Sequence, residues 1–293
     1  MKNTPGHGEK LSYYDWGETP FYALQSDQRF SYCMYVPQTY SEKSSNTYPL
    51  IVLVHGTCRA PFEYRSHFAE FCDEHHCIAL APLFPVGMGE DGDLDGYKYI
   101  AHKGIRYDHV LNAMIDEVSR KYRIEKKVLL HGFSGGGHFV HRYFFLHPGR
   151  LRVVSIGAPG VVTLLNSELA FWRGTKDLKQ VFGVKPDIEA MQKVAVQLIV
   201  GEQDTETWEI TIPQTSFRWM PGANDAGKTR IERIESLGRS LTQNGISYRL
   251  DKVPGTAHNG WQLLNGVKEF FSSSLVQAGA RGSHASHMSK SIL

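Results

Sequence analysis

The sequence lacks several features that mark specialised classes of protein. Its 293 residues include only four cysteines, which show neither the paired spacing of zinc ligands nor the density of a disulfide scaffold. No apolar run reaches the length of a bilayer span, and the amino terminus lacks the apolar core of a signal peptide. These absences favour free thiols and a soluble, cytoplasmic protein.

An excess of charge of one sign is also missing. The formal net charge is +2, and no long basic stripe runs along the chain. Proteins that bind nucleic acid use such stripes to replace the counterions of the phosphate backbone. We therefore expect neither nucleic acid nor a membrane as a partner, and the sequence leaves the oligomeric state open.

What the chain does have is an alternation of strand-like and helix-like segments in an ordinary globular composition, 41% hydrophobic and 21% charged. This alternation predicts an α/β fold with a mostly parallel central sheet flanked by helices. The length suits one large domain, which we place at residues 1–278. The expected strands are 50–54, 77–82, 127–131, 153–159, 196–200 and 247–253, and the expected helices are 61–74, 107–122, 135–147, 229–243 and a last one ending near 275.

Two segments fall outside this alternation. Residues 161–194 contain helix-like stretches and a Gly-Pro break, and we interpret them as a small helical lid inserted between strands. Residues 282–288, GSHASHM, resemble a cloning-derived sequence, so we predict that 279–293 is a cloning-derived or disordered tail.

The strongest chemical signal is the sequence GFSGGG at residues 132–137, where Ser134 follows a predicted buried strand and precedes a predicted helix. Such a turn forces the serine toward positive φ and requires small residues at Gly132 and Gly136. A phosphate-binding loop is the alternative, but no lysine follows the glycines. The pattern favours a nucleophilic serine.

At this motif the chain resembles the α/β-hydrolase superfamily, in particular its dienelactone hydrolase and polyhydroxyalkanoate depolymerase branches. Three more segments carry the resemblance, which covers residues 20–275: LVHGTC at 53–58 is similar to an oxyanion loop, VGEQD at 200–204 to an acid turn, and PGTAH at 254–258 to a histidine loop. The order serine, aspartate, histidine is that of the superfamily.

The resemblance implies a catalytic triad of Ser134, Asp204 and His258. Asp204 follows a strand at its carboxyl end, whereas the rival carboxylates Asp187 and Asp225 lie in the predicted lid and in a polar loop. His258 lies in a loop after the last predicted strand, and a surface histidine in a Gly-rich turn is the alternative interpretation.

The resemblance also implies an oxyanion hole formed by the backbone N–H groups of Thr57 and Gly135, and it implies no cofactor and no metal. Trp172, Trp208 and Trp261 lie near the triad loops in sequence, so we expect them to line an apolar substrate pocket, with core packing as the equal alternative.

Residues 91–96, DGDLDG, match the opening of a calcium loop. The twelfth position of such a loop is His102 here rather than a bidentate glutamate, so we interpret the run as a solvated acidic loop.

These features predict a serine esterase that forms an acyl-enzyme and cleaves a small-molecule carboxylic ester or lactone. The lid suggests a macrolactone, such as a macrolide, among several substrates. Amide, peptide or thioester hydrolysis needs the same triad, and a catalytically silent scaffold that binds a ligand is the contrasting hypothesis.

Overall fold

The computed structural model describes residues 11–288, with side chains described as far as residue 276. The strands are β1 Gly17–Glu18, β2 Tyr22–Ala23, β3 Ser31–Val36, β4 Leu50–Val54, β5 Ile78–Leu83, β6 Ala101–His102, β7 Ile105–Arg106, β8 Val128–Phe133, β9 Leu151–Gly157, β10 Ala195–Gly201 and β11 Arg249–Val253. The α-helices are α1 Pro61–His67, α2 Ala69–His75, α3 Tyr107–Lys121, α4 Gly135–Leu146, α5 Leu178–Phe182, α6 Ile188–Met191, α7 Arg230–Gln243 and α8 Gly260–Met288, with short 3-10 helices η1 Tyr13–Asp15, η2 Gly96–Tyr99 and η3 Pro148–Arg150.

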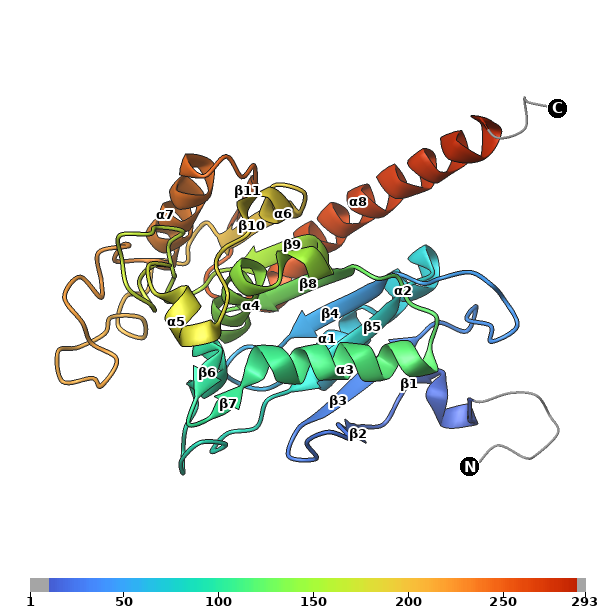
Figure 1. Ribbon diagram of the computed structural model, residues 1–293, viewed down its shortest axis with the longest axis horizontal. Coiled ribbons are helices and arrows are strands. Elements are labelled where there is room, and N and C mark those ends of the chain that lie inside the picture. The colour runs from blue at the N-terminus through green and yellow to red at the C-terminus, as the bar shows by residue number, and fades with distance from the viewer. Residues whose placement is uncertain (1–10, 289–293) are drawn as a thin grey trace.

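The main sheet has the strand order β1-β3-β5-β4-β8-β9-β10-β11, and β2 also pairs with β3. The strands from β5 to β11 in this order run parallel, whereas β1, β2 and β5 pair with β3 in antiparallel fashion. Figure 1 shows helices packed along the sheet, with long loops gathered at one of its ends beside α5 and α7. The predicted α/β architecture with a mostly parallel sheet is confirmed.

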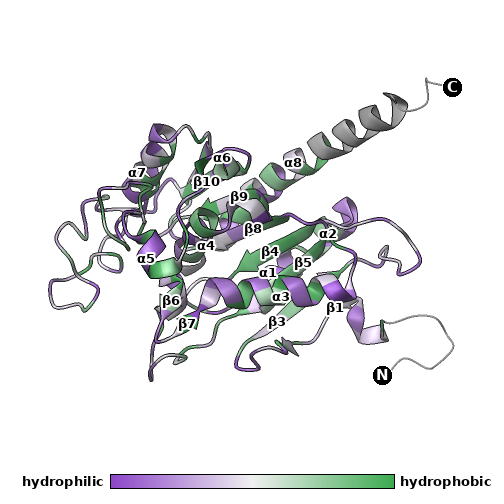
Figure 2. Ribbon diagram, viewed as in Figure 1, coloured by the Kyte–Doolittle hydropathy of each residue, from purple (hydrophilic) through white to green (hydrophobic). Residues whose placement is uncertain are grey.

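The core is built from strands that are apolar along their whole length. Every residue of β4, from Leu50 to Val54, is fully buried, because helices cover both faces of the sheet. Figure 2 shows the same concentration of hydrophobic residues in β4 and β5. Each such aliphatic side chain contributes about 1.5–3 kcal/mol to folding. The core therefore holds the carboxyl ends of these strands, and the loops that follow them, in fixed positions.

Two predicted helices differ in extent from those observed. The helix expected at 61–74 is divided into α1 and α2 at Phe68, whose ring is fully buried against Phe71 and Phe271. The terminal helix α8 continues past residue 275 to Met288. Residues 289–293 of the predicted tail lie outside the described residues, so the domain end at 278 stays a prediction. Within residues 11–288, no helix combines the length and apolar composition that a bilayer crossing requires.

Four histidines are buried in this framework: His55, His131, His138 and His141. At Nε2, three of them, His55, His138 and His141, accept a backbone N–H at 2.9–3.0 Å, which requires the neutral imidazole. Burial lowers the pKa of His55 to about 3 and that of His131 to about 4, and it lowers the pKa of His138 and His141 well below 6.5.

Because these histidines are buried and neutral, we expect the free energy of unfolding to fall at mildly acidic pH. In the unfolded chain they bind protons as the pH falls through their ordinary pKa, about 6.5, whereas the folded protein stays unprotonated there. Their stabilisation is present above that pH and declines toward the lowered pKa values, by up to about 1.4 kcal/mol per pH unit for each histidine. We expect the melting temperature, followed by circular dichroism, to drop steeply between about pH 6.5 and pH 5.

The matched controls are His131→Gln, which removes a buried histidine, and His109→Gln, which removes one whose side chain is 61% exposed. The first should make the pH dependence shallower and the second should leave it unchanged. A melting temperature that is level over this pH range would contradict the argument.

Candidate active site

Ser134 lies in the tight turn between β8 and α4, with φ 54° and ψ −115°. The glycines around it are required by close backbone approach. A Cβ atom on Gly136 would lie 2.2 Å from the carbonyl oxygen of Val54, and one on Gly132 would lie 2.5 Å from the carbonyl oxygen of Gly136. The sequence expectation of a strained serine flanked by small residues thus describes the geometry of this turn.

His258 and Asp204 complete a continuous chain of hydrogen bonds with Ser134. His258 Nε2 is 3.0 Å from Ser134 Oγ, and His258 Nδ1 is 2.7 Å from Asp204 Oδ2. Because the carboxylate accepts from Nδ1–H, Nε2 is free to accept the serine proton. Asp204 is fully buried, and the His258 side chain is 22% exposed. The ring of Phe133 packs against the imidazole with centroids 4.6 Å apart.

The acid turn and the histidine loop are bound to each other by their backbones. The N–H of Glu202 donates to Val253 O at 3.0 Å, and that of Gln203 donates to Thr256 O at 2.8 Å. A Cβ atom on Gly201 would lie 2.2 Å from the Thr256 carbonyl oxygen, so only glycine allows this approach. The carboxylate and the imidazole are therefore carried by one rigid unit at the end of β10 and β11.

The two rival carboxylates have other partners. Asp187 caps α6 by accepting the N–H of Ala190 at 3.0 Å, and Asp225 pairs with Arg173 at 3.0 Å. Neither is hydrogen-bonded to His258 in the part of the chain that the structure describes.

Arg230 is a residue of the site that the sequence patterns did not single out. It opens α7, is 1% exposed, and places Nη1 3.3 Å from Asp204 Oδ1 while Nη2 pairs with Glu209. Each oxygen of the Asp204 carboxylate thus has its own partner, His258 on one and Arg230 on the other. A charged residue is common at the first position of a helix, so the sequence around Arg230 gives no sign that it contacts Asp204.

The N–H groups of Thr57 and Gly135 lie beside the serine. Both residues line the cavity that contains Ser134, and a Cβ atom on Gly135 would lie 3.2 Å from Thr57 N and 2.3 Å from the Tyr97 hydroxyl. Neither N–H donates to an acceptor among the described residues. Free backbone N–H groups beside a serine are the kind of donor that can stabilise a developing oxyanion.

The cavity over Ser134 has a volume of about 320 Å³. Apart from the residues already described, its walls come from two segments, 94–99 and 209–218, and from the turn at Gly160. The lining residues are Thr57, Leu94, Asp95, Lys98, Tyr99, Ser134, Gly135, His138, Gly160, Val161, Glu209, Ile210, Thr211, Ile212, Pro213, Ser216, Arg218 and Arg230.

The acidic loop at 91–96 shapes the first of these walls. One carboxylate oxygen of Asp93 accepts the backbone N–H groups of Asp95 and Gly96, each at 3.0 Å. This Asx turn leads into the 3-10 helix η2, whose residues Lys98 and Tyr99 line the cavity. Asp93, which occupies a ligand position of the calcium-loop pattern, therefore stabilises a turn of the backbone.

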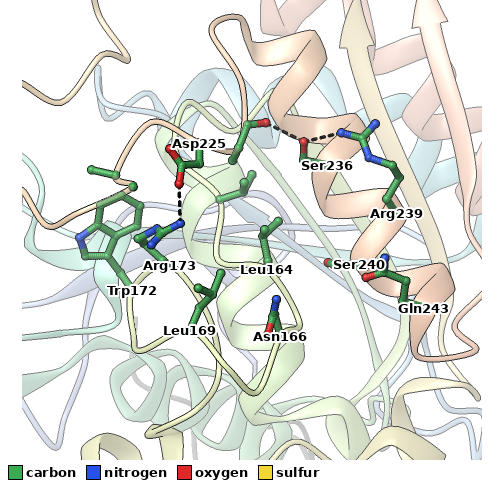
Figure 3. Close-up of a pocket in the computed structure, with 14 residues that line it drawn as sticks. Leu164, Asn166, Leu169, Trp172, Arg173, Asp225, Ser236, Arg239, Ser240 and Gln243 are labelled. Carbon is green, nitrogen blue, oxygen red and sulfur yellow. Dashed lines mark hydrogen bonds and ion pairs between the residues drawn. The ribbon is translucent and has the colours of Figure 1, made fainter.

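The lid and the tryptophans are placed differently from the sequence interpretation. Of the predicted lid at 161–194, only Val161 lines the cavity at Ser134. Trp172 lines a separate cavity of about 210 Å³, at whose side it appears in Figure 3. Trp208 is 77% exposed, and Trp261 stacks on His67 with centroids 4.9 Å apart. The wall expected from the lid and these indoles comes instead from residues 94–99 and 209–218, because the long connection after β10 crosses the site.

No family model and no curated protein sequence matches the chain. Solved structures do. A poly(3-hydroxybutyrate) depolymerase from Bordetella parapertussis superposes with a TM-score of 0.67 at 22% identity, over 89% of this chain and 94% of that one. Poly(aspartic acid) hydrolase-1 from Sphingomonas sp. KT-1 gives a TM-score of 0.64 at 19% identity, over 82% and 92%.

An S-formylglutathione hydrolase from Agrobacterium tumefaciens gives a TM-score of 0.56 at 15% identity, over 84% of this chain and 89% of that one. Each superposition spans most of both chains, and these neighbours share with this chain the mostly parallel sheet and its flanking helices. With its serine turn at the end of β8 and its acid and histidine loops after β10 and β11, the chain has the α/β-hydrolase fold.

Proposed function

We propose that this protein is a serine hydrolase that cleaves a carboxylic ester through an acyl-enzyme, with Ser134 as nucleophile, His258 as general base and Asp204 as its orienting acid. The observation that carries the proposal is the unbroken path from Ser134 Oγ to His258 at 3.0 Å and on to the buried Asp204 carboxylate at 2.7 Å. An activated nucleophile needs a base within such a distance and a third group that orients the base.

In the first half of the reaction, His258 Nε2 takes the proton of Ser134 while Oγ forms a bond to the carbonyl carbon of the ester. The negative charge moves to the carbonyl oxygen, where the N–H groups of Thr57 and Gly135 stabilise it. Asp204 stabilises the imidazolium that forms. The tetrahedral intermediate then breaks its bond to the alkoxide oxygen, which leaves with the proton from His258.

In the second half, a water molecule gives a proton to His258 and attacks the acyl carbon. The bond to Ser134 Oγ breaks, the serine recovers its proton, and the carboxylic acid is released. Arg230 acts as a positioning residue in both halves, since it binds the Asp204 oxygen that His258 does not use.

Two considerations narrow the substrate. The solved neighbours include a poly(3-hydroxybutyrate) depolymerase, a ferulic acid esterase and an S-formylglutathione hydrolase, and these names support an ester or thioester. Poly(aspartic acid) hydrolase-1 is named for a polymer joined by amide bonds, so amide hydrolysis on the same triad stays the alternative. The cavity of about 320 Å³ is at the small end of ligand sites, which favours a compact ester or lactone over a macrolide ring.

A fluorophosphonate probe should label Ser134 stoichiometrically, as intact mass and peptide mapping will show. In Ser134→Ala the labelling should vanish and the hydrolysis of 4-nitrophenyl butyrate should fall by at least about a thousandfold. The control Ser167→Ala alters an exposed serine and should keep both properties. Folded protein that neither reacts with the probe nor cleaves an ester would instead support a silent scaffold.

Arg230→Gln should reduce kcat for the same ester by about ten- to a hundredfold with little change in KM, because it leaves one buried carboxylate oxygen of Asp204 without a cation. Arg230→Lys restores the charge and should recover part of the loss. Arg239→Gln, on the same helix and away from the cavity at Ser134, is the matched control. Equal effects of all three on unfolding by urea and none on kcat would contradict the positioning role.

A further inference from the structure

The side chains around the cavity at Ser134 include more cations than are paired with carboxylates. Lys98, Arg218 and Arg230 line it, and two more arginines, Arg142 and Arg233, are buried beside it. Lys98 pairs with Asp95 at 2.6 Å, and Arg230 pairs with Asp204 and Glu209. The other three arginines have no carboxylate within hydrogen-bond distance in the described part of the chain.

Two of these three have other acceptors. Arg142 donates to Thr163 at 2.8 Å and to the carbonyl oxygen of Lys98, and Arg233 donates to backbone carbonyl oxygens such as that of Ile210. Burial, together with the nearby charge of Arg218, lowers the pKa of Arg142 to about 10. The positive charge in this region is thus poorly balanced by protein groups.

Arg218 is the cation with the fewest partners. Its side chain is 12% exposed, and its guanidinium carbon stands 3.9 Å from the centroid of the Tyr99 ring. Its Nε and Nη2 atoms are buried without a hydrogen-bond partner among the described residues. The nearest carboxylate oxygen, on Asp93, is 4.0 Å from Nη2 and already accepts two backbone N–H groups.

The two unpartnered nitrogen atoms of Arg218, Nε and Nη2, suit one kind of ligand. Nε–H and Nη2–H lie on the same edge of the guanidinium plane and point in parallel, which is the fork that binds both oxygens of a carboxylate. Stacking on Tyr99 fixes that plane, so little side-chain freedom is lost on binding. The cavity that Arg218 and Ser134 both line also has apolar side chains in its wall, those of Val161, Ile210 and Ile212.

We propose that the substrate of this cavity is an ester that carries a second, anionic group, a carboxylate at one end of a short apolar body, and that Arg218 binds this carboxylate through Nε and Nη2. The inference rests on the proposed hydrolase function and adds its substrate class. Arg218 is a binding residue here and takes no part in the bond changes at Ser134.

The test compares esters of matched size that differ in one charge. On the acyl side the pair is mono-4-nitrophenyl glutarate and 4-nitrophenyl pentanoate, and on the alcohol side it is 4-carboxyphenyl acetate and 4-carbamoylphenyl acetate. We expect kcat/KM for the anionic member of at least one pair to exceed that of its neutral partner by about tenfold or more. In Arg218→Gln that ratio should collapse toward one, chiefly through KM.

Arg218→Lys keeps the charge without the fork and should retain only part of the preference. The matched control is Arg239→Gln, since this arginine lines the separate cavity of Figure 3, where it donates to Ser236. It should leave every rate and ratio unchanged. Circular dichroism of each variant establishes that it is folded.

The outcomes separate the two proposals. Hydrolysis of the neutral esters with no anionic preference in either pair, or a preference that survives Arg218→Gln, overturns the role of Arg218 and leaves the hydrolase standing. Failure of all four esters together with failure of the fluorophosphonate to label Ser134 overturns the hydrolase itself.

Discussion

The site depends on how closely the first turn of α4 approaches the strands beneath it. Gly136 lies against the carbonyl oxygen of Val54 on β4, and a Cβ atom on Gly137 would lie 2.3 Å from that of Gly157 on β9. No other side chain fits between these backbones. Because the helix can start directly at the edge of the sheet, the serine before it is forced out at positive φ, toward the histidine and the two free N–H donors.

A second constraint is the distribution of charge. Asp204 is buried where a lone carboxylate would be costly, and it is retained because its two oxygens are shared between an imidazole and a guanidinium. The same guanidinium also pairs with Glu209, which faces the cavity. The carboxylate of Asp204, the proposed orienting acid, is therefore connected through Arg230 to a charged residue of the cavity wall.

Sequence patterns located the residues that follow strands. Ser134 comes directly after β8, and Asp204 and His258 lie in the turns that follow β10 and β11, so their meeting at one edge of the parallel sheet follows from topology. The sequence does not single out Arg218, because it belongs to a long connection whose path is decided by tertiary contacts rather than by periodicity. It does not single out Arg230 either, because a charged residue at the start of a helix is common. The same cause affects the pocket wall. Two long connections flank β10: the sequence predicts a lid in the one before it, at 161–194, whereas the one after it supplies residues 209–218 of the cavity wall.

The tryptophans illustrate a different limit. Nearness in sequence to a triad loop says nothing of the direction in which an indole points, and Trp208, four residues after the acid, faces solvent. Glycine was more informative than any aromatic residue, because the steric demand at positions 132 and 136 comes from backbone atoms packed against the serine turn, those of Gly136 and of Val54 on β4.

The segment 205–229 lies between Asp204 and Arg230, whose side chains form an ion pair. It is thus a long loop whose two ends are held together by the ion pair between Asp204, the proposed acid, and Arg230. Since the entropy of closing a loop changes only slowly with its length once the ends are fixed, residues can be added or removed here at small cost. Insertions and deletions in this segment can therefore change the cavity wall while the proposed triad beneath it keeps its geometry.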